Sequence, residues 1–209
     1  MTRALIINAH QYYDWAKGEL NAHLAGVIEQ ELQAKGFTVR HTRIDDGYDV
    51  QEEVEKHQWA DLIILQTPVY WFGAPWTHKK YLDEVFNHAI TGQTLITDDG
   101  RSRQDPSRQY GSGGNMQGKR FMMSLTWNAP AAAFGDQRQR LFAGSTDHDA
   151  FQHIANCYKF CGADILPTFS CFDVVKAPTI EQDVKRLEAH LNALIPAQAV
   201  TTEAEEALV

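Results

Sequence analysis

Four apolar residues in a row, Leu62 to Leu65, are the feature of this sequence that most limits its fold. The run is short and rich in β-branched isoleucine, which is typical of a strand buried on both faces inside a parallel sheet. Pro68 ends regular pairing soon afterwards, because proline has no N–H group to donate. Helical spacing of apolar residues follows from Lys79 to Phe86. A buried strand followed by a helix predicts an α/β protein.

The same alternation recurs along the chain. Such repeats favour an open parallel sheet with helices on both faces. Five strands fit the doubly wound, flavodoxin-like strand order 2-1-3-4-5. The second strand carries Arg40, His41 and Arg43, so we predict that it lies at an edge of the sheet. The predicted strands are residues 3–8, 37–44, 62–65, 120–126 and 165–172, and the predicted helices are 18–36, 49–57, 79–86, 150–160 and 179–194.

Composition bounds the class of protein. The 209 residues suffice for one domain, which we place at residues 1–196, followed by an acidic tail at 197–209. A net charge of −8 argues against a nucleic-acid partner. No apolar stretch reaches the roughly 18 residues of a membrane span. The N-terminal apolar run is too short for a signal peptide, and three cysteines do not suggest a disulfide framework, so we predict a cytoplasmic protein.

The predicted strand order indicates where a ligand should bind. In open α/β sheets, ligands bind at the carboxyl ends of the strands where the order reverses, which here lies between the first and third strands. The loops that meet at this point follow the first, third and fourth strands. They are residues 9–21, 68–72 and 126–130.

The first of these loops can hold a phosphate group. It ends by opening a helix, and the free N–H groups and dipole of a helix start attract an anion. Lys17 adds positive charge, and Gly18 allows close approach. An ordinary helix start has the same pattern. The loop lacks Gly-x-Gly-x-x-Gly, so a Rossmann nicotinamide site is not supported. The candidate residues are Ala16, Lys17, Gly18, Glu19, Leu20 and Asn21.

The other two loops suit a flat aromatic ligand. Pro68 is followed by Val69, Tyr70, Trp71 and Phe72, four bulky residues that either pack into the core or a dimer interface, or wall a ring such as a flavin. After the fourth strand, a hydroxyl, an amide and backbone N–H groups could bond the polar edge of that ring. A capped turn with a core tryptophan is the alternative. These residues are Thr126, Trp127, Asn128 and Ala129.

Other motifs carry less weight. Gly113 to Lys119 has Walker A spacing, but Arg120 stands where Ser or Thr is needed and the motif precedes its strand, so we reject a P-loop. His153, Cys157 and Cys161 share a helix face, but their spread of about 12 Å is too long for one ion, so no metal site is predicted. The sequence contains no nucleophile motif, and the catalytic residues remain unknown.

The chain resembles the flavodoxin-like NAD(P)H:quinone oxidoreductases, and most of all the bacterial modulator-of-drug-activity B enzymes. The resemblance extends from the first strand to the fifth. Its most specific parts are Gly73-Ala-Pro-Trp76 and Ser124-Leu-Thr-Trp-Asn-Ala-Pro130. The remaining parts are residues 5–8, 18–21, Pro68 with Trp71, 79–81, 110–114 and 166–169.

This resemblance implies a function. It implies two-electron reduction of quinones by NADPH through non-covalently bound FAD, with ping-pong kinetics, in a homodimer whose flavin pocket lies at the subunit boundary. In the family the segment at Ala16–Asn21 holds the cofactor pyrophosphate, and Tyr110 lies near the cofactor or the neighbouring subunit. FAD in place of FMN, and NADPH in place of NADH, come from the resemblance alone.

Two alternatives stay open. One is a flavin reductase that acts on azo, nitro or metal-complex acceptors with the same residues. The other is a non-catalytic flavin electron carrier. Two long irregular segments, residues 90–119 and 131–149, argue against the carrier, because a minimal carrier has little use for such additions.

Overall fold

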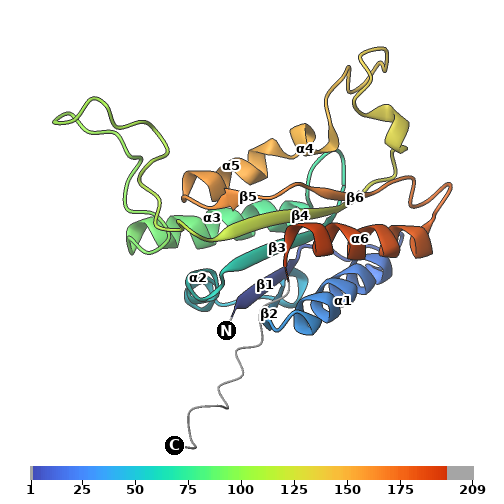
Figure 1. Ribbon diagram of the computed structural model, residues 1–209, viewed down its shortest axis with the longest axis horizontal. Coiled ribbons are helices and arrows are strands. Elements are labelled where there is room, and N and C mark those ends of the chain that lie inside the picture. Colours follow the sequence, from blue (N-terminus) through green and yellow to red (C-terminus); the bar gives the residue numbers. More distant parts are fainter. Residues whose placement is uncertain (1, 197–209) are drawn as a thin grey trace, which may run out of the picture.

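A single parallel sheet forms the centre of the molecule (Figure 1). The computed structural model describes residues 2–196, so the predicted tail lies outside the described residues. The strand order β2-β1-β3-β4-β5 confirms the predicted flavodoxin-like topology and the edge position of the second strand. The strands are β1 (Arg3–Asn8), β2 (Thr38–Arg43), β3 (Leu62–Pro68), β4 (Arg120–Thr126), β5 (Asp164–Ile165) and β6 (Phe169–Cys171).

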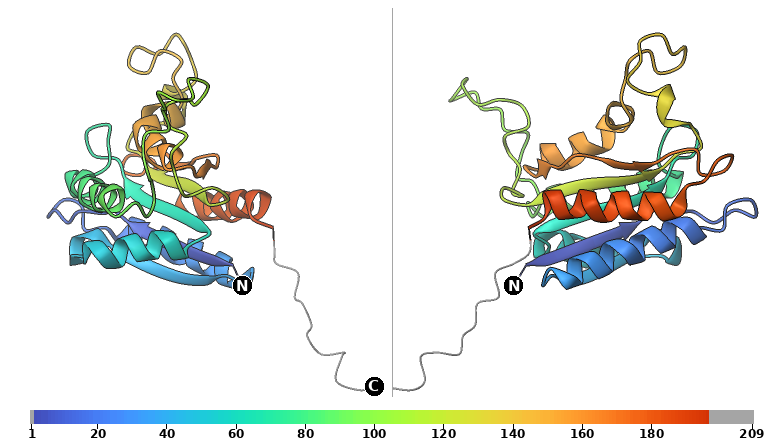
Figure 2. Two further views of the ribbon diagram at one scale, coloured as in Figure 1. Left: turned by 90° about the vertical axis from the view of Figure 1, so that its left-hand side faces the viewer. Right: turned by 45° about the vertical axis from the view of Figure 1, so that its right-hand side comes forward.

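Helices cover both faces of this sheet, as the sequence predicts (Figure 2). α1 (Glu19–Ala34) and α6 (Ile180–Leu194) lie on one face, and α2 (Val50–Trp59), α3 (Trp76–Thr91) and α5 (Gln152–Phe160) lie on the other. One short helix, α4 (Asp147–Ala150), precedes α5, and two 3-10 turns span Ile44–Asp46 and Ala131–Ala133. In the part of the chain that the structure describes, no helix has the length and apolar character needed to cross a membrane.

The fifth strand differs from its prediction. We expected one strand over residues 165–172, whereas the structure has the short strands β5 and β6, both paired with β4. The interruption contains Pro167, whose missing N–H removes a hydrogen bond from the ladder. Helix α3 also begins at Trp76, directly after Pro75, three residues before the start predicted at Lys79.

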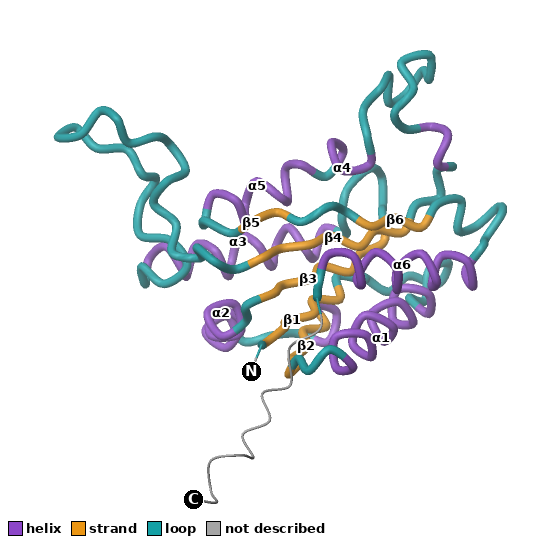
Figure 3. The backbone as a smooth tube through the Cα atoms, in the orientation of Figure 1, coloured by secondary structure: helices purple, strands orange, loops and turns teal. Residues whose placement is uncertain are grey.

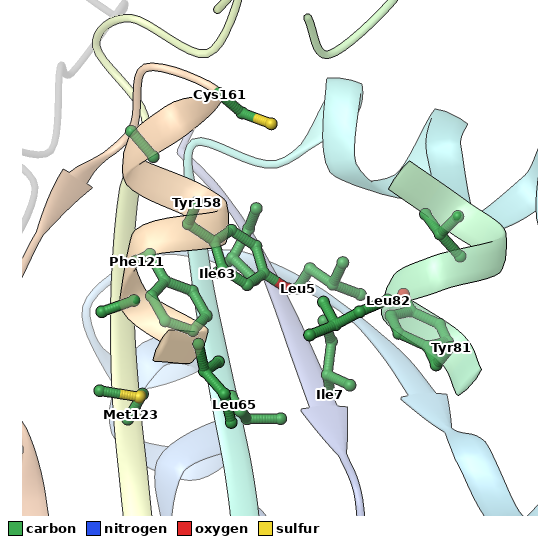
Figure 4. Close-up of a cluster of buried hydrophobic side chains, with 14 of the residues drawn as sticks. Leu5, Ile7, Ile63, Leu65, Tyr81, Leu82, Phe121, Met123, Tyr158 and Cys161 are labelled. Carbon is green, nitrogen blue, oxygen red and sulfur yellow. The ribbon is translucent and has the colours of Figure 1, made fainter. Parts of the chain in front are cut away.

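The strands separate two cores because alternate side chains point to opposite faces. Leu5, Ile7, Ile63 and Leu65 point toward α2, α3 and α5, where Figure 4 shows them beside Tyr81 and Tyr158. Phe121 and Tyr158 stack in this core with ring centroids 3.7 Å apart. The opposite core, under α1 and α6, is mainly aliphatic and includes Ile6, Leu24 and Leu187.

Two long loops leave the sheet at its opposite ends (Figure 3). Residues 92–119 lead into the amino end of β4 and project from that side of the molecule. Residues 127–146 leave the carboxyl end of β4 and rise over the opposite side. Only the second loop is therefore placed to form a wall at the carboxyl ends of the strands.

Candidate functional site

A cavity of about 870 Å³ opens at the carboxyl ends of β1, β3 and β4, as the strand order predicts. Its volume is near the upper end of the usual range for ligand sites, which is about 300–1,000 Å³. All the predicted site residues except Tyr110 line it: Ala16, Lys17, Gly18, Glu19, Leu20, Asn21, Pro68, Val69, Tyr70, Trp71, Phe72, Thr126, Trp127, Asn128 and Ala129.

The start of α1 forms one end of the cavity. The first hydrogen bond of this helix runs from Ala22 N to Gly18 O at 2.9 Å, which leaves the N–H groups of residues 19–21 without a partner inside the helix. Those groups and the positive end of the helix dipole face an anion favourably, and the exposed Lys17 adds a charge of the same sign.

Gly18 makes this helix start possible. Its φ of +85° is a left-handed conformation that glycine adopts without steric cost. A Cβ atom here would lie 2.6 Å from the His10 ring. That ring is itself fixed, because His10 Nε2 lies 2.9 Å from Ala16 O. Only glycine fits between the ring and the helix.

A strained turn forms the second wall. Tyr70 N donates to Gly73 O at 2.8 Å and Gly73 N donates to Tyr70 O at 3.2 Å, which closes a two-residue hairpin. Trp71 and Phe72 between them have φ of 50° and 67°, the left-handed pair of a type I′ turn. Asparagine and glycine are the usual residues here, and each non-glycine residue at positive φ costs roughly 1–2 kcal/mol.

The side chains of this turn face different surroundings. The Tyr70 ring lies 5.2 Å from Trp15 and 5.7 Å from Tyr13, and its hydroxyl donates to Gln11 O at 3.3 Å. Burial raises the pKa of Tyr70 to about 12, so the phenol stays protonated at neutral pH. Trp71, in contrast, is 95% exposed.

Trp127 and its neighbours make the third wall. The Trp127 ring is buried against Phe134 at 4.9 Å, and Phe142 packs on Phe134 at 4.2 Å, so the loop after β4 folds back over the site. Phe72 joins this group through an edge contact with Phe142 at 6.2 Å. Trp127 Nε1 is buried and has no hydrogen-bond partner within the described residues, although the residue lines the cavity.

Tyr110 does not reach this cavity within one chain. Its ring lies 5.0 Å from Phe160, at the end of α5, and the Arg101 guanidinium lies 5.5 Å above it. α5 ends on the side of the sheet where residues 92–119 project, away from the carboxyl ends of the strands (Figure 1). Tyr110 is 69% exposed, so a contact with another molecule would not require refolding.

Sequence reasoning missed five lining residues: His10, Trp15, Leu141, Val174 and Val175. His10 and Trp15 lie inside the predicted first loop, so the loop prediction could have included them. Val174 and Val175 follow β6, and the strand order gave no reason to include this loop. Leu141 lies in an irregular segment whose path no periodic pattern predicts.

Comparisons with known proteins agree with this fold. A family model described as a flavodoxin-like fold matches residues 2–194. The NADPH:quinone oxidoreductase MdaB of Haemophilus influenzae is 41% identical over 187 residues, which cover 90% of this chain and 96% of that protein.

Two solved structures show the fold alone, because their sequence identity is low. A proposed quinone reductase from Klebsiella pneumoniae superposes with a TM-score of 0.73 at 20% identity, covering 96% of this chain and 87% of that chain. The general stress protein 14 of Treponema denticola, in complex with FMN, gives a TM-score of 0.61 at 21% identity, covering 92% and 99%. Together these matches confirm the resemblance found in the sequence, and the chain belongs to the flavodoxin-like family.

Proposed function

We propose that this protein binds FAD without a covalent bond and catalyses the reduction of quinones by NADPH. One observation carries the proposal: a single cavity joins a helix start suited to phosphate with a wall of aromatic side chains suited to a flat ring. The Haemophilus relative is an NADPH:quinone oxidoreductase, and its similarity covers nearly the whole chain.

The residues present fit such a cofactor. The N–H groups at the start of α1 and Lys17 would hold the pyrophosphate, and Gly18 leaves the space that a Cβ would fill. The backbone of Val69 to Phe72 would lie along the ring, and Thr126 to Ala129 would bond its polar edge. The buried Trp127 Nε1, which has no partner in the described chain, is a donor that a ligand could satisfy.

The cofactor would supply the redox chemistry, and the protein would position the cofactor. When bound, a flavin accepts a hydride from a nicotinamide and gives one to an acceptor, which is chemistry that side chains cannot supply. The protein would orient the ring, and the loop after β4, in which Phe134 packs on Trp127 and Phe142 packs on Phe134, would form the wall on one side of the cavity. Because a single cavity would admit donor and acceptor in turn, we expect ping-pong kinetics.

The proposal includes a homodimer. Tyr110 does not line its own cavity and is exposed on a loop that projects from the other end of the sheet, so a partner chain is the simplest way to bring it to a cofactor. Exposed aromatic side chains at the cavity mouth, including Trp71 and Trp15, are also typical of a surface that another chain covers.

An anaerobic titration tests the activity. Purified protein is reconstituted with FAD or FMN, reduced with NADPH, and then mixed with menadione while the visible flavin bands are recorded. We expect stronger retention of FAD than FMN, bleaching by NADPH and recovery of the bands with the quinone. Failure to bind any flavin would overturn the proposal. A bound flavin that NADPH leaves oxidised would favour an electron carrier.

Mixing two inactive variants tests the dimer. Tyr110→Ala keeps the cavity and loses the aromatic side chain, whereas Gly18→Ala loses the phosphate end and keeps Tyr110. If Tyr110 completes the partner's site, exchange of subunits between the two variants restores one sound site per mixed dimer, and activity returns. If the mixture stays as inactive as its components, Tyr110 does not act across the boundary.

A further inference from the structure

A row of buried polar side chains crosses the sheet beneath the cavity. Asn8 on β1, Gln66 on β3 and Ser124 on β4 are register neighbours, so they lie at one level and point toward the α1 face. Gln66 and Ser124 have no exposed surface, and Asn8 is 9% exposed. Polar side chains in the centre of a buried parallel sheet are unusual, because apolar residues would be more stable there.

Three amides form a continuous chain of hydrogen bonds, which we call the buried amide relay: Gln66, Asn21 and Asn8. Gln66 Nε2 donates to Asn21 Oδ1 at 2.9 Å, and Asn21 Nδ2 donates to Asn8 Oδ1 at 2.5 Å. The same Asn8 oxygen accepts the backbone N–H of His10 at 3.0 Å. The relay therefore runs from the central strand to the beginning of the loop that precedes α1.

The donor and acceptor orientation of the three amides is determined at the His10 end of the relay. A backbone N–H can only donate, so the atom of Asn8 that faces His10 must be the oxygen. Asn21 must then donate to it, which leaves the Asn21 oxygen to accept from Gln66. Gln66 is consequently oriented with its own oxygen away from Asn21, where Oε1 is buried without a partner in the described chain.

The relay connects both ends of the loop from His10 to Asn21, which would bind the phosphate groups. Asn21 is the third residue of α1 and is 3% exposed, so its side chain anchors the first helical turn from below. His10 begins the loop, and its ring limits the space beside Gly18. Gln66 lies outside the cavity lining, yet it reaches both ends of the loop through the other two amides.

We infer that Gln66 is a positioning residue that fixes the loop from His10 to Asn21 for the phosphate-bearing part of the cofactor. This inference rests on the proposed function. A side chain with a purely stabilising role would satisfy its own polar atoms, whereas Gln66 leaves one carbonyl oxygen without a partner among residues 2–196 while it orients Asn21. Replacing Gln66 should therefore weaken the binding of ligands that carry phosphate and no others.

Gln66→Met tests this, because methionine matches the length of glutamine and has no amide. Apo-protein is titrated with FAD and, separately, with riboflavin, which has the same ring and no phosphate. We expect FAD to bind about tenfold or more weakly, the equivalent of one lost buried hydrogen bond, and riboflavin to bind as in the wild type. The melting temperature of the apo-protein should change little, since one unpartnered carbonyl is removed and another, on Asn21, is created.

Thr67→Val is the matched control. Thr67 is equally buried on the same strand but points to the opposite face, and its hydroxyl donates to the adjacent Pro68 O. This variant should keep the wild-type ratio of FAD to riboflavin affinity. Gln66→Leu gives a second apolar replacement if the methionine variant does not fold.

Two results would overturn the inference. If Gln66→Met weakens FAD and riboflavin by the same factor, Gln66 has only a packing role. If it weakens neither while the wild type binds both, the relay does not position the loop. A wild type that binds no flavin would instead overturn the proposed function.

Discussion

The two loops that face each other across the cavity are held by different means. The loop from His10 to Asn21 is fixed from below by buried hydrogen bonds, which extend to Gln66 in the central strand. The turn from Tyr70 to Gly73 is fixed by its own two backbone hydrogen bonds, and it keeps Trp71 and Phe72 at positive φ. The first loop lowers stability because it requires polar side chains in the core. The turn lowers stability because two of its residues adopt a strained backbone conformation.

The difference follows from what each loop presents. A phosphate site needs several N–H groups aimed at one point, and buried amides can fix a helix start in that way. An aromatic wall needs side chains held out from the sheet, and a tight turn does this with few contacts. Local strain of this kind persists where the surrounding structure enforces it, and it is concentrated at functional sites.

The largest expected effect comes from breaking the first loop. Gly18→Ala adds a Cβ 2.6 Å from the His10 ring at a φ of +85°. Strain and overlap together should make the native conformation of the loop about 3 kcal/mol less favourable. FAD affinity, measured by fluorescence titration, should fall by about a hundredfold. The control is Gly26→Ala in the interior of α1, where the added Cβ would meet no described atom within 4 Å apart from its chain neighbours and the backbone of its own helix.

Gly26→Ala should leave FAD affinity unchanged and raise the free energy of unfolding by up to about 1 kcal/mol, because alanine favours the helix. If Gly18→Ala binds FAD as well as this control does, then the first loop does not hold the phosphate groups.

A smaller effect, of opposite sign for stability, is expected at the turn. Trp71→Asn should raise the free energy of unfolding by roughly 1 kcal/mol, because asparagine tolerates positive φ and the exposed ring has few contacts to lose. Turnover of NADPH with a quinone should fall. Trp71→Ala removes the same ring but keeps the strain, so it should lose activity without gaining stability. Chemical denaturation of the apo-proteins distinguishes the two variants.

A loss of stability in Trp71→Asn would mean that the ring packs against the protein and that the turn is not strained for function.

The same comparison shows how far the sequence could predict this protein. The strand rhythm around Leu62–Leu65 was sufficient for the fold, and the strand order was sufficient to bring the three loops together. Neither of these two predictions required knowledge of an individual side-chain contact. Both rest on hydrophobic periodicity, which is strong in long repeated patterns.

Other features could not be predicted. Local propensity argues against a type I′ turn with Trp71 and Phe72 at its centre, so the residues of the turn do not predict its type. The position of Tyr110 depends on the path of a long irregular segment. Gln66 looks like one more residue of a strand, because its role depends on the register of β1 and β3 and on the helix above them.

The smallest expected effect is a response to acid at a buried histidine near the start of α3. α3 begins shortly after the turn, and its third residue, His78, is 1% exposed with Nε2 unpartnered among the residues described. Burial, with a smaller contribution from the nearby His153, lowers the pKa of His78 from 6.5 to about 3. The three amides of the relay, in contrast, carry no group that titrates in this range.

The sign follows from proton uptake. Below pH 6.5 the unfolded chain binds a proton at His78 that the folded protein does not bind until about pH 3, so the free energy of unfolding falls as the pH is lowered through this window. For this group alone the loss between pH 8 and pH 6 is about 0.8 kcal/mol. Burial also lowers the pKa of His57, which adds a loss in the same direction.

Urea denaturation at pH 8 and pH 6 should therefore show a smaller difference in His78→Leu than in the wild type, with the His57 contribution remaining. His88→Leu, at an exposed histidine on the same helix, is the matched control and should keep the wild-type difference. An equal pH dependence in all three proteins would show that His78 accepts a proton in the folded state.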